Sequence, residues 1–151
     1  MTKKEKALEY FRNSFNCSQS VFTVFGTGRG LSEDTCLKVS CAFGGGMGRM
    51  QHTCGAVTGA MMVLGLLFGK GIDDPEDKKT ITYALAKDLT DRFRALNGST
   101  ICRELLDGLD MNKPDELKKI QENRLFEIRC EKYVTDAISI IEKSIKEQNL
   151  K

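Results

Sequence analysis

The sequence has a single histidine, no Cys-x-x-Cys pair and no apolar run long enough to cross a bilayer. With one histidine and no serine–histidine–aspartate arrangement, ordinary hydrolytic catalysis and histidine–zinc catalysis are disfavoured. The missing Cys-x-x-Cys pair excludes a thioredoxin-type dithiol and a zinc ribbon, and without Cys-x-x-Cys-His there is no c-type haem attachment site. The longest apolar run, residues 56–68, is too short for a membrane span and predicts a buried core helix.

Charge and the N-terminal residues exclude further classes. The net charge is +2 at pH 7, with no basic stripe or tract of interleaved aromatic residues, so we expect no nucleic-acid partner. Residues 1–6 run into a polar helical pattern without an apolar signal region, so we expect a cytoplasmic protein with no membrane insertion. In a reducing compartment, the six cysteines are expected to be catalytic or metal-binding rather than disulfide staples.

Helical spacing dominates the chain. Apolar residues recur at intervals of three and four positions, and no stretch shows the period-two alternation of a strand. Helix start and stop signals lie at Ser32, Asp74-Pro75, Asn97-Gly98 and Lys113-Pro114. With no linker and no internal repeat, the sequence predicts one domain over residues 1–151. The expected fold is all-α, a compact multi-helix bundle with the apolar helix 56–68 at its centre and a glycine-rich loop.

Most of the 14 glycines lie in the first half of the chain, and two clusters, residues 26–30 and 44–48, invite a nucleotide-binding interpretation. The first cluster follows no strand, and the second lacks the Lys-Ser/Thr ending of a phosphate loop. They are better explained as tight turns in which the backbone approaches a reactive group closely. Gly55 and Gly59 place a smooth stripe on one helix face, where a neighbouring helix is expected to pack closely.

Cys54 follows the second glycine cluster and opens a predicted helix. Thr53 is a good N-cap, so Cys54 is expected at the first helical position. Free amide N–H groups and the positive end of the helix dipole favour a thiolate there, and a thiolate attacks disulfides or binds metals. His52, two residues earlier, is a candidate to relay a proton or to stabilise that thiolate.

Three further cysteines lie at or near predicted helix starts. Residues 16–19 have the form of a capping box, which places Cys17 at a helix start. Ser99 or Thr100 is expected to cap the helix that contains Cys102, so this thiol also falls in a first turn. Cys130 lies within or near the start of the long last helix.

Cys36 and Cys41 are five positions apart on a predicted helix, a spacing that puts them on different faces, and we expect both to be core residues. The same explanation is open for every cysteine of the chain, because a free cysteine packs as a small hydrophobic residue. Whether a cysteine has a chemical role therefore depends on whether the fold brings it close to the others.

A combination of motifs runs through nearly the whole chain: residues 16–22, 43–49, 53–60 and 102–106, and Cys130 with the residues up to 137. This combination resembles the C_GCAxxG_C_C family of redox-active proteins. The four cysteines that define the family map onto Cys17, Cys54, Cys102 and Cys130, while Cys36 and Cys41 are additional. The resemblance implies a redox role and, since members are often encoded near transporter genes, a functional link to a transporter. A related domain occurs in a multihaem cytochrome, but this chain lacks the haem attachment motif.

Two classes of chemical function follow, and a third alternative gives the cysteines no chemical role. In a thiol–disulfide redox protein, Cys54 attacks as a thiolate, and Cys17, Cys102 or Cys130 resolves the mixed disulfide. In a metalloprotein, the same four thiolates hold an iron–sulfur cluster or a structural zinc. In a helical interaction protein, the cysteines only pack. The redox partner and the formation of a homo-oligomer are left open by the sequence.

Overall fold

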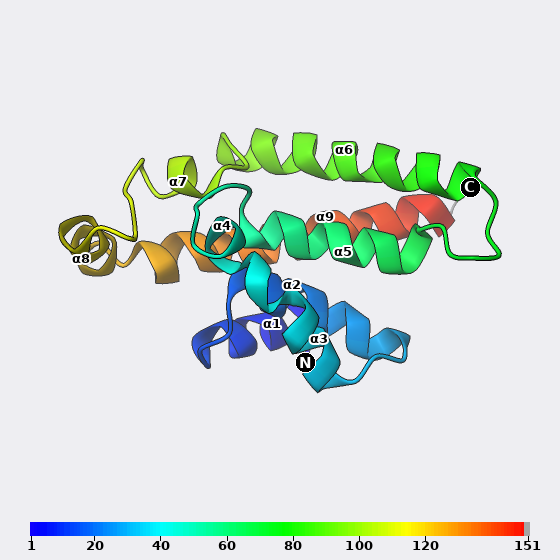
Figure 1. Ribbon diagram of the computed structural model, residues 1–151, viewed down its shortest axis with the longest axis horizontal. Helices are drawn as coiled ribbons and strands as arrows, with labels where there is room; N and C mark the ends of the chain where they lie inside the picture. The colour runs from blue at the N-terminus through cyan, green and yellow to red at the C-terminus, as the bar shows by residue number, and fades with distance from the viewer. Residues whose placement is uncertain (150–151) are drawn as a thin grey trace.

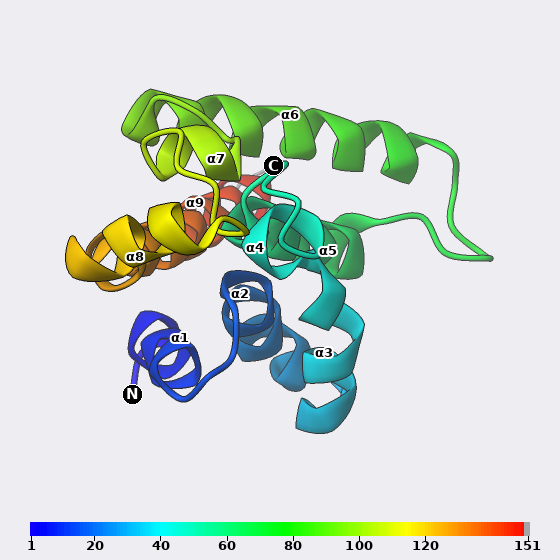
Figure 2. The same ribbon diagram turned by 60° about the vertical axis from the view of Figure 1, so that its left-hand side comes forward.

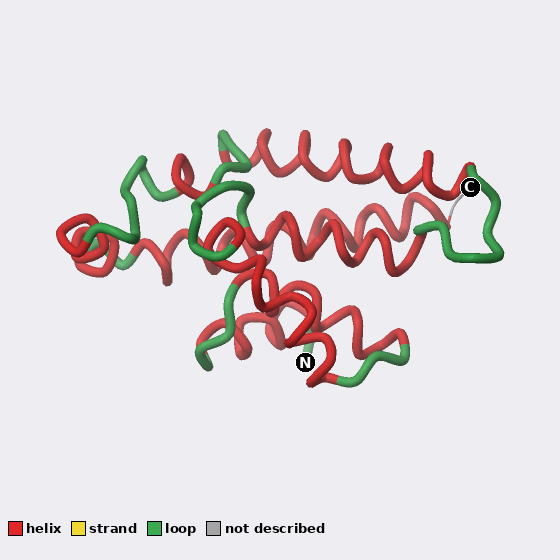
Figure 3. Tube along the Cα trace, viewed as in Figure 1, coloured by secondary structure: helices red, strands yellow, loops and turns green. Residues whose placement is uncertain are grey.

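A computed structural model describes residues 1–149 of the chain. Over this range the structure consists of helices and loops without a strand, as Figure 3 shows, so the predicted all-α fold is confirmed. The α-helices are α1 (Lys3–Arg12), α2 (Cys17–Gly26), α3 (Glu33–Ser40), α5 (Gly55–Phe68), α6 (Asp77–Asn97), α7 (Cys102–Leu105), α8 (Pro114–Glu122) and α9 (Glu131–Asn149), while α4 (Gly44–Met47) is a short turn with left-handed backbone from Gly45 on. Shorter turns are η1 (Thr27–Arg29), η2 (Cys41–Phe43) and the π-helical η3 (Phe126–Cys130).

The apolar helix α5 lies in the middle of the molecule. In Figure 1, α6 runs along one side of it, α9 lies beside it and the α1–α3 group covers the other side. Most residues of α5 up to Leu64 are buried, with Met61 and Met62 half-buried, whereas Leu66 in the last turn is 38% exposed. The predicted central helix is therefore confirmed, with an end that reaches solvent. Within residues 1–149, none of the helices combines the length and apolar character needed to cross a membrane.

Local signals set most of the helix boundaries. Ser32 caps α3 through its side chain, Gly98 ends α6 in the left-handed conformation and Pro114 is the first residue of α8, as their chemistry predicts. Helix α6 begins at Asp77 rather than at the predicted start, because the carboxylate of Asp74 accepts a hydrogen bond from the Gly71 N–H and belongs to the preceding turn.

The smooth face of α5 packs against α2, as expected. A β-carbon placed on Gly59 would lie 2.8 Å from the carbonyl oxygen of Ser18, so only a glycine lets the two backbones approach this closely. One turn earlier, a β-carbon on Gly55 would lie 3.3 Å from that of Cys17. The close packing of α2 on α5 thereby places the helix start that carries Cys17 beside the start of α5.

Candidate functional site

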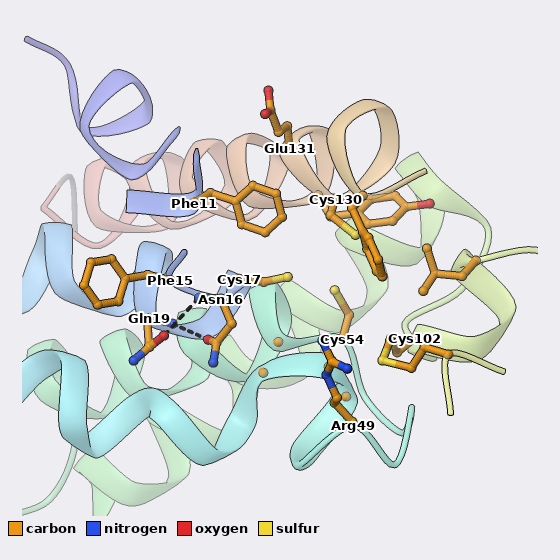
Figure 4. Close-up of a pocket in the computed structure, with 18 of the residues that line it drawn as sticks. Phe11, Phe15, Asn16, Cys17, Gln19, Arg49, Cys54, Cys102, Cys130 and Glu131 are labelled. Carbon is orange, nitrogen blue, oxygen red and sulfur yellow. Dashed lines mark hydrogen bonds between the residues drawn. The ribbon is translucent and has the colours of Figure 1, made fainter. Parts of the chain in front are cut away.

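A pocket of about 770 Å³ lies where the starts of α2, α5 and α7 meet the end of η3. Its walls include all four of the family-type cysteines: Cys17, Cys54, Cys102 and Cys130. Figure 4 shows their sulfur atoms directed toward one another around this space. Residues far apart in the sequence are thus brought to one place, which is the arrangement that a shared site requires. All six cysteines of the chain are free thiols in this structure.

Backbone hydrogen bonds hold Cys54 and Cys102 side by side. The Cys54 N–H donates to the Thr100 carbonyl oxygen at 2.7 Å, and the Cys102 N–H donates to the His52 carbonyl oxygen at 2.6 Å. These bonds flank the antiparallel bridge between Thr53 and Ile101. The expectation that Thr53 caps α5 is therefore wrong: Thr53 is used in the bridge, and Cys54 itself is the N-cap residue, one position before the helix.

The starts of the other two helices can be compared in the same way. Asn16 and Gln19 form the predicted capping box, with Cys17 as the first residue of α2. Cys102 is the first residue of α7 and thus lies in the first turn, as predicted, but neither Ser99 nor Thr100 is the cap: the N-cap residue is Ile101, which makes no side-chain cap. The Ser99 hydroxyl instead accepts a hydrogen bond from the Ile101 N–H at 2.9 Å.

Left-handed backbone forms one wall of the pocket. Residues 45–49 all have φ between +61° and +68°, a conformation that costs an L-amino acid about 1–2 kcal/mol per residue. Glycine avoids this cost at three of these positions, but Met47 and Arg49 do not. At Gly46 a side chain is also sterically excluded, since a β-carbon there would lie 2.6 Å from the backbone nitrogen of His52. The glycine-rich segment is thus a tight turn, as predicted, with an unusual handedness.

Gln51 connects this turn to the segment around Leu109 and Met111 through hydrogen bonds, and sequence analysis did not identify it as a site residue. Its side chain is 3% exposed, donates to the Leu109 carbonyl oxygen at 2.9 Å and accepts from the Met111 N–H at 2.8 Å. Both partners are about 60 positions away, so no local pattern could have revealed the contact. These bonds hold the left-handed turn in place against the segment that follows α7.

Burial dominates the protonation of the site. The pKa of the Cys54 thiol is raised well above its ordinary value by burial and by the neighbouring Cys17 and Cys102 thiols, although backbone N–H groups at the start of α5 oppose the shift. A side-chain hydrogen bond with Cys130 and burial raise the pKa of Cys17, and burial raises the pKa of Cys102 from 9.0 to about 12. The predicted thiolate at Cys54 is therefore wrong for the free protein, because desolvation outweighs the helix start.

Of the three remaining candidate residues, Cys41 lines the pocket, whereas His52 and Cys36 do not. His52 is exposed and is not one of the residues that line the pocket, so its imidazole is not brought to the cysteines. Cys36 is fully buried in the core, as expected. Cys41 was expected in the core as well, but it is exposed and lines the pocket. The reason is that α3 ends at Ser40 and the chain turns away into η2.

The rest of the pocket wall is aromatic and charged. Phe11, Phe15, Phe126 and Tyr133 contribute rings, and the charged residues are Arg12, Arg49, Glu127 and Glu131. Arg12 is neutralised by Glu131 through two hydrogen bonds of 2.7 and 3.0 Å. Among residues 1–149, the guanidinium of Arg49 has no ion pair and no hydrogen bond.

The sulfur donors suit a soft metal chemically, but their placement does not form a ligand set. Within the part of the chain that the structure describes, no three histidine, cysteine, aspartate or glutamate side chains are grouped as a metal ion requires. The described residues thus show no ligand group for a single ion such as a structural zinc, and the iron–sulfur cluster stays an alternative for the same four thiols.

Comparison with known proteins agrees with the cysteine pattern. A family model described as "Putative redox-active protein (C_GCAxxG_C_C)" matches residues 15–144, which include all four pocket cysteines of the motif. The chain belongs to this family. A protein of Archaeoglobus fulgidus described as uncharacterized is similar to it, with 26% identity over 152 residues, 96% of this chain and 94% of the relative. No solved structure matches the chain. Membership in the C_GCAxxG_C_C family points to redox chemistry and leaves the mechanism to the site itself.

Proposed function

We propose that the protein carries out thiol–disulfide exchange, with Cys17 and Cys130 as the pair that cycles between two thiols and a disulfide. The observation that supports this most strongly is that both thiols line the pocket with their sulfur atoms directed toward one another (Figure 4), and the pKa of Cys17 is raised first of all by Cys130. Disulfide formation requires that two thiols come close together, and two thiols that face each other across one pocket meet this requirement best. Because the pair is assembled from α2 and η3, its reactivity depends on the tertiary fold.

Cys17 is the attacking thiol in this proposal. It is partly exposed, and it lines the pocket, whereas Cys54, Cys102 and Cys130 are only 4%, 8% and 7% exposed. Access decides which sulfur meets a disulfide first. Cys54, the attacking residue expected from the sequence, becomes a neighbour that can take the disulfide from Cys17 in a second exchange.

The exchange balances as a two-electron reaction. Cys17 loses its proton, attacks one sulfur of a substrate disulfide and expels the other sulfur as a thiolate. Cys130 then loses its proton and attacks Cys17, which releases the second substrate thiolate and leaves a Cys17–Cys130 disulfide. The two protons from the protein thiols end on the two released thiolates, so the substrate is reduced by two electrons and the protein is oxidised by two.

Mass spectrometry of disulfide-linked peptides tests the proposal. Reduced protein is treated with a small neutral disulfide, dithiodipyridine, and the linked peptides are identified. We expect a link between the peptides of Cys17 and Cys130, accompanied by release of two thiopyridones for each disulfide consumed. Cys17→Ser should abolish the link, and so should Cys130→Ser. Cys36→Ser, a change at a thiol buried away from the pocket, should leave it in place.

Two outcomes would overturn the proposal. One is oxidation that links other cysteines while Cys17 and Cys130 stay reduced in folded protein. The other is anaerobically purified protein that contains iron and loses it when the pocket cysteines are replaced. Circular dichroism of each variant distinguishes lost chemistry from lost folding, because the unmodified protein should be strongly helical.

A further inference from the structure

We infer that the disulfide reduced in this pocket is a small molecule that carries a carboxylate, and that Arg49 binds this carboxylate. The inference rests on the proposed thiol–disulfide exchange and adds a substrate class and a specificity-determining residue to it. It draws on three features of the pocket: the depth of the thiols, the character of the walls and the charges on them.

The depth of the thiols restricts the size of the substrate. Exchange with a folded partner requires that the two sulfurs meet at the surface, but Cys54, Cys102 and Cys130 are all less than a tenth exposed. Cys17 is reached through the pocket that it lines. A volume of about 770 Å³ is within the range of small-molecule sites and is too small for a protein domain. A low-molecular-weight disulfide can therefore enter where a folded disulfide protein cannot.

The walls suit an organic body with a negative group at one end. Phe11, Phe15, Phe126 and Tyr133 supply an apolar lining for the body of the substrate. On the side of the glycine-rich turn, Figure 4 shows the side chain of Arg49 extending toward the cysteines. Gly45 leaves room for the stem of Arg49, because a β-carbon on residue 45 would lie 2.9 Å from the γ-carbon of Arg49.

Arg49 is set up to bind a ligand rather than another part of the chain. Its backbone is strained at φ +63°, and its carbonyl oxygen accepts a hydrogen bond from the Asn112 side chain at 2.8 Å. Within residues 1–149, its guanidinium makes no ion pair or hydrogen bond. Strained backbone beside a reactive centre points to a functional requirement, and a guanidinium matches a carboxylate with two parallel hydrogen bonds.

The other charges of the pocket leave this role to Arg49. Arg12 is paired with Glu131, so that its charge is already compensated. Glu127 belongs to η3, the element that also carries Cys130, and Figure 4 shows Cys130 on the side of the pocket away from Arg49. A carboxylate is thus attracted to the turn side of the pocket and repelled from the η3 side.

The test compares two aromatic disulfides of similar size, one with a carboxylate on each ring, dithiobis(nitrobenzoate), and one without, dithiodipyridine. Second-order rate constants for oxidation of the pocket thiols are measured in a Cys41→Ser background, which removes the exposed thiol. Arg49→Gln is compared with Arg29→Gln, which removes the same charge from the exposed turn η1.

We expect Arg49→Gln to slow oxidation by the carboxylated disulfide about threefold to fivefold, the range of a partly exposed ion pair, and to leave the neutral disulfide unaffected. The difference should shrink at high ionic strength, because salt screens the interaction. Arg29→Gln should change neither rate. Equal slowing of both probes by Arg49→Gln, or no slowing, would overturn the role of Arg49.

A protein oxidant tests the size restriction. Oxidised protein disulfide isomerase, which has a strongly oxidising disulfide, should react with Cys17 more than about tenfold slower than dithiodipyridine, because the thiol lies inside the pocket. A rate equal to that of the small disulfide would overturn the substrate class. If no probe forms the Cys17–Cys130 link, the proposed exchange fails. If the link forms at rates independent of Arg49, only the carboxylate preference fails.

Discussion

The left-handed turn over residues 45–49 and the layer formed by helices α5, α6 and α9 (Figure 2) differ in backbone conformation and in what they contribute to the protein. The layer is regular and right-handed, and side chains such as Leu89, Phe93 and Ile138 are fully buried in it. The turn is short, it includes strained residues and it lines the pocket.

This difference separates stability from site geometry. Burial of apolar side chains in the layer supplies a large favourable free energy that does not depend on one backbone conformation. The turn needs particular residues at particular positions, and in return it keeps the backbone close to the cysteines without filling the pocket. Changes in the layer should therefore affect stability, and changes in the turn should affect the thiols.

The largest effect is expected in the layer. Leu89→Ala removes a side chain that is fully buried on α6 and should lower the free energy of unfolding by about 3 kcal/mol. The relative labelling rates of the pocket thiols in folded protein should not change. Leu96→Ala, on the same helix but 57% exposed, is the control and should cost less than about 0.5 kcal/mol. Urea unfolding measures both, and equal costs would erase the distinction between buried and exposed positions.

A change in the turn should be smaller in stability and larger at the site. Gly46→Ala forces a side chain into φ +68° and against the backbone of Gln51 and His52, at a cost of about 2 kcal/mol. Thiol labelling of Cys54 should speed up as the turn moves. Gly28→Ala, where no atom lies within 4 Å, should change neither quantity. Unchanged labelling in a destabilised Gly46 variant would show that the turn does not shield the thiols.

The thiols themselves should label in the reverse of the order that their helix positions predict. At pH 7, iodoacetamide should modify exposed Cys41 at least about tenfold faster than Cys54, because burial raises the pKa of Cys54 and restricts access to it. Since a raised pKa leaves less thiolate at neutral pH, labelling of Cys54 should increase as the pH rises through 9 and beyond. A plateau for Cys54 below pH 8 would instead indicate a stabilised thiolate.

The smallest effect is expected at Asn16, which caps α2 and also binds the Cys41 carbonyl oxygen. Asn16→Ala removes the α2 cap and the bond from the Asn16 side chain to the Cys41 carbonyl oxygen, and it should lower the unfolding free energy by about 1 kcal/mol. Asn16→Asp keeps the oxygen that caps α2 and should cost less. If the two variants melt at the same temperature, the cap contributes little, and the bond to Cys41 accounts for the loss.

Much of the fold was predictable because its signals are local. Caps at Asn16 and Ser32, a left-handed stop at Gly98 and a proline at the start of α8 each act within one turn of a helix. Two predictions failed because the side chains concerned are used elsewhere in the fold. Asp74 and Thr53 have side chains suited to capping, but the first closes a loop turn and the second lies in a bridge to Ile101.

The four cysteines of the candidate site could be predicted from the sequence, but the other residues that surround them could not. Its members follow from the motif, but Cys41 entered the pocket lining and His52 stayed outside it. Gln51 gave no signal, because its two hydrogen-bond partners belong to a distant segment. The left-handed conformation of Met47 and Arg49 also runs against the intrinsic preference of those residues.

The sequence by itself determined the all-α class, the central apolar helix and the capped helix start at Cys17, since hydrophobic period and capping chemistry operate between residues a few positions apart. Only the tertiary structure decided which thiols share a pocket and which of them is accessible. It also decided the direction in which the pKa of Cys54 is shifted, because that direction depends on the water excluded by segments from distant parts of the chain.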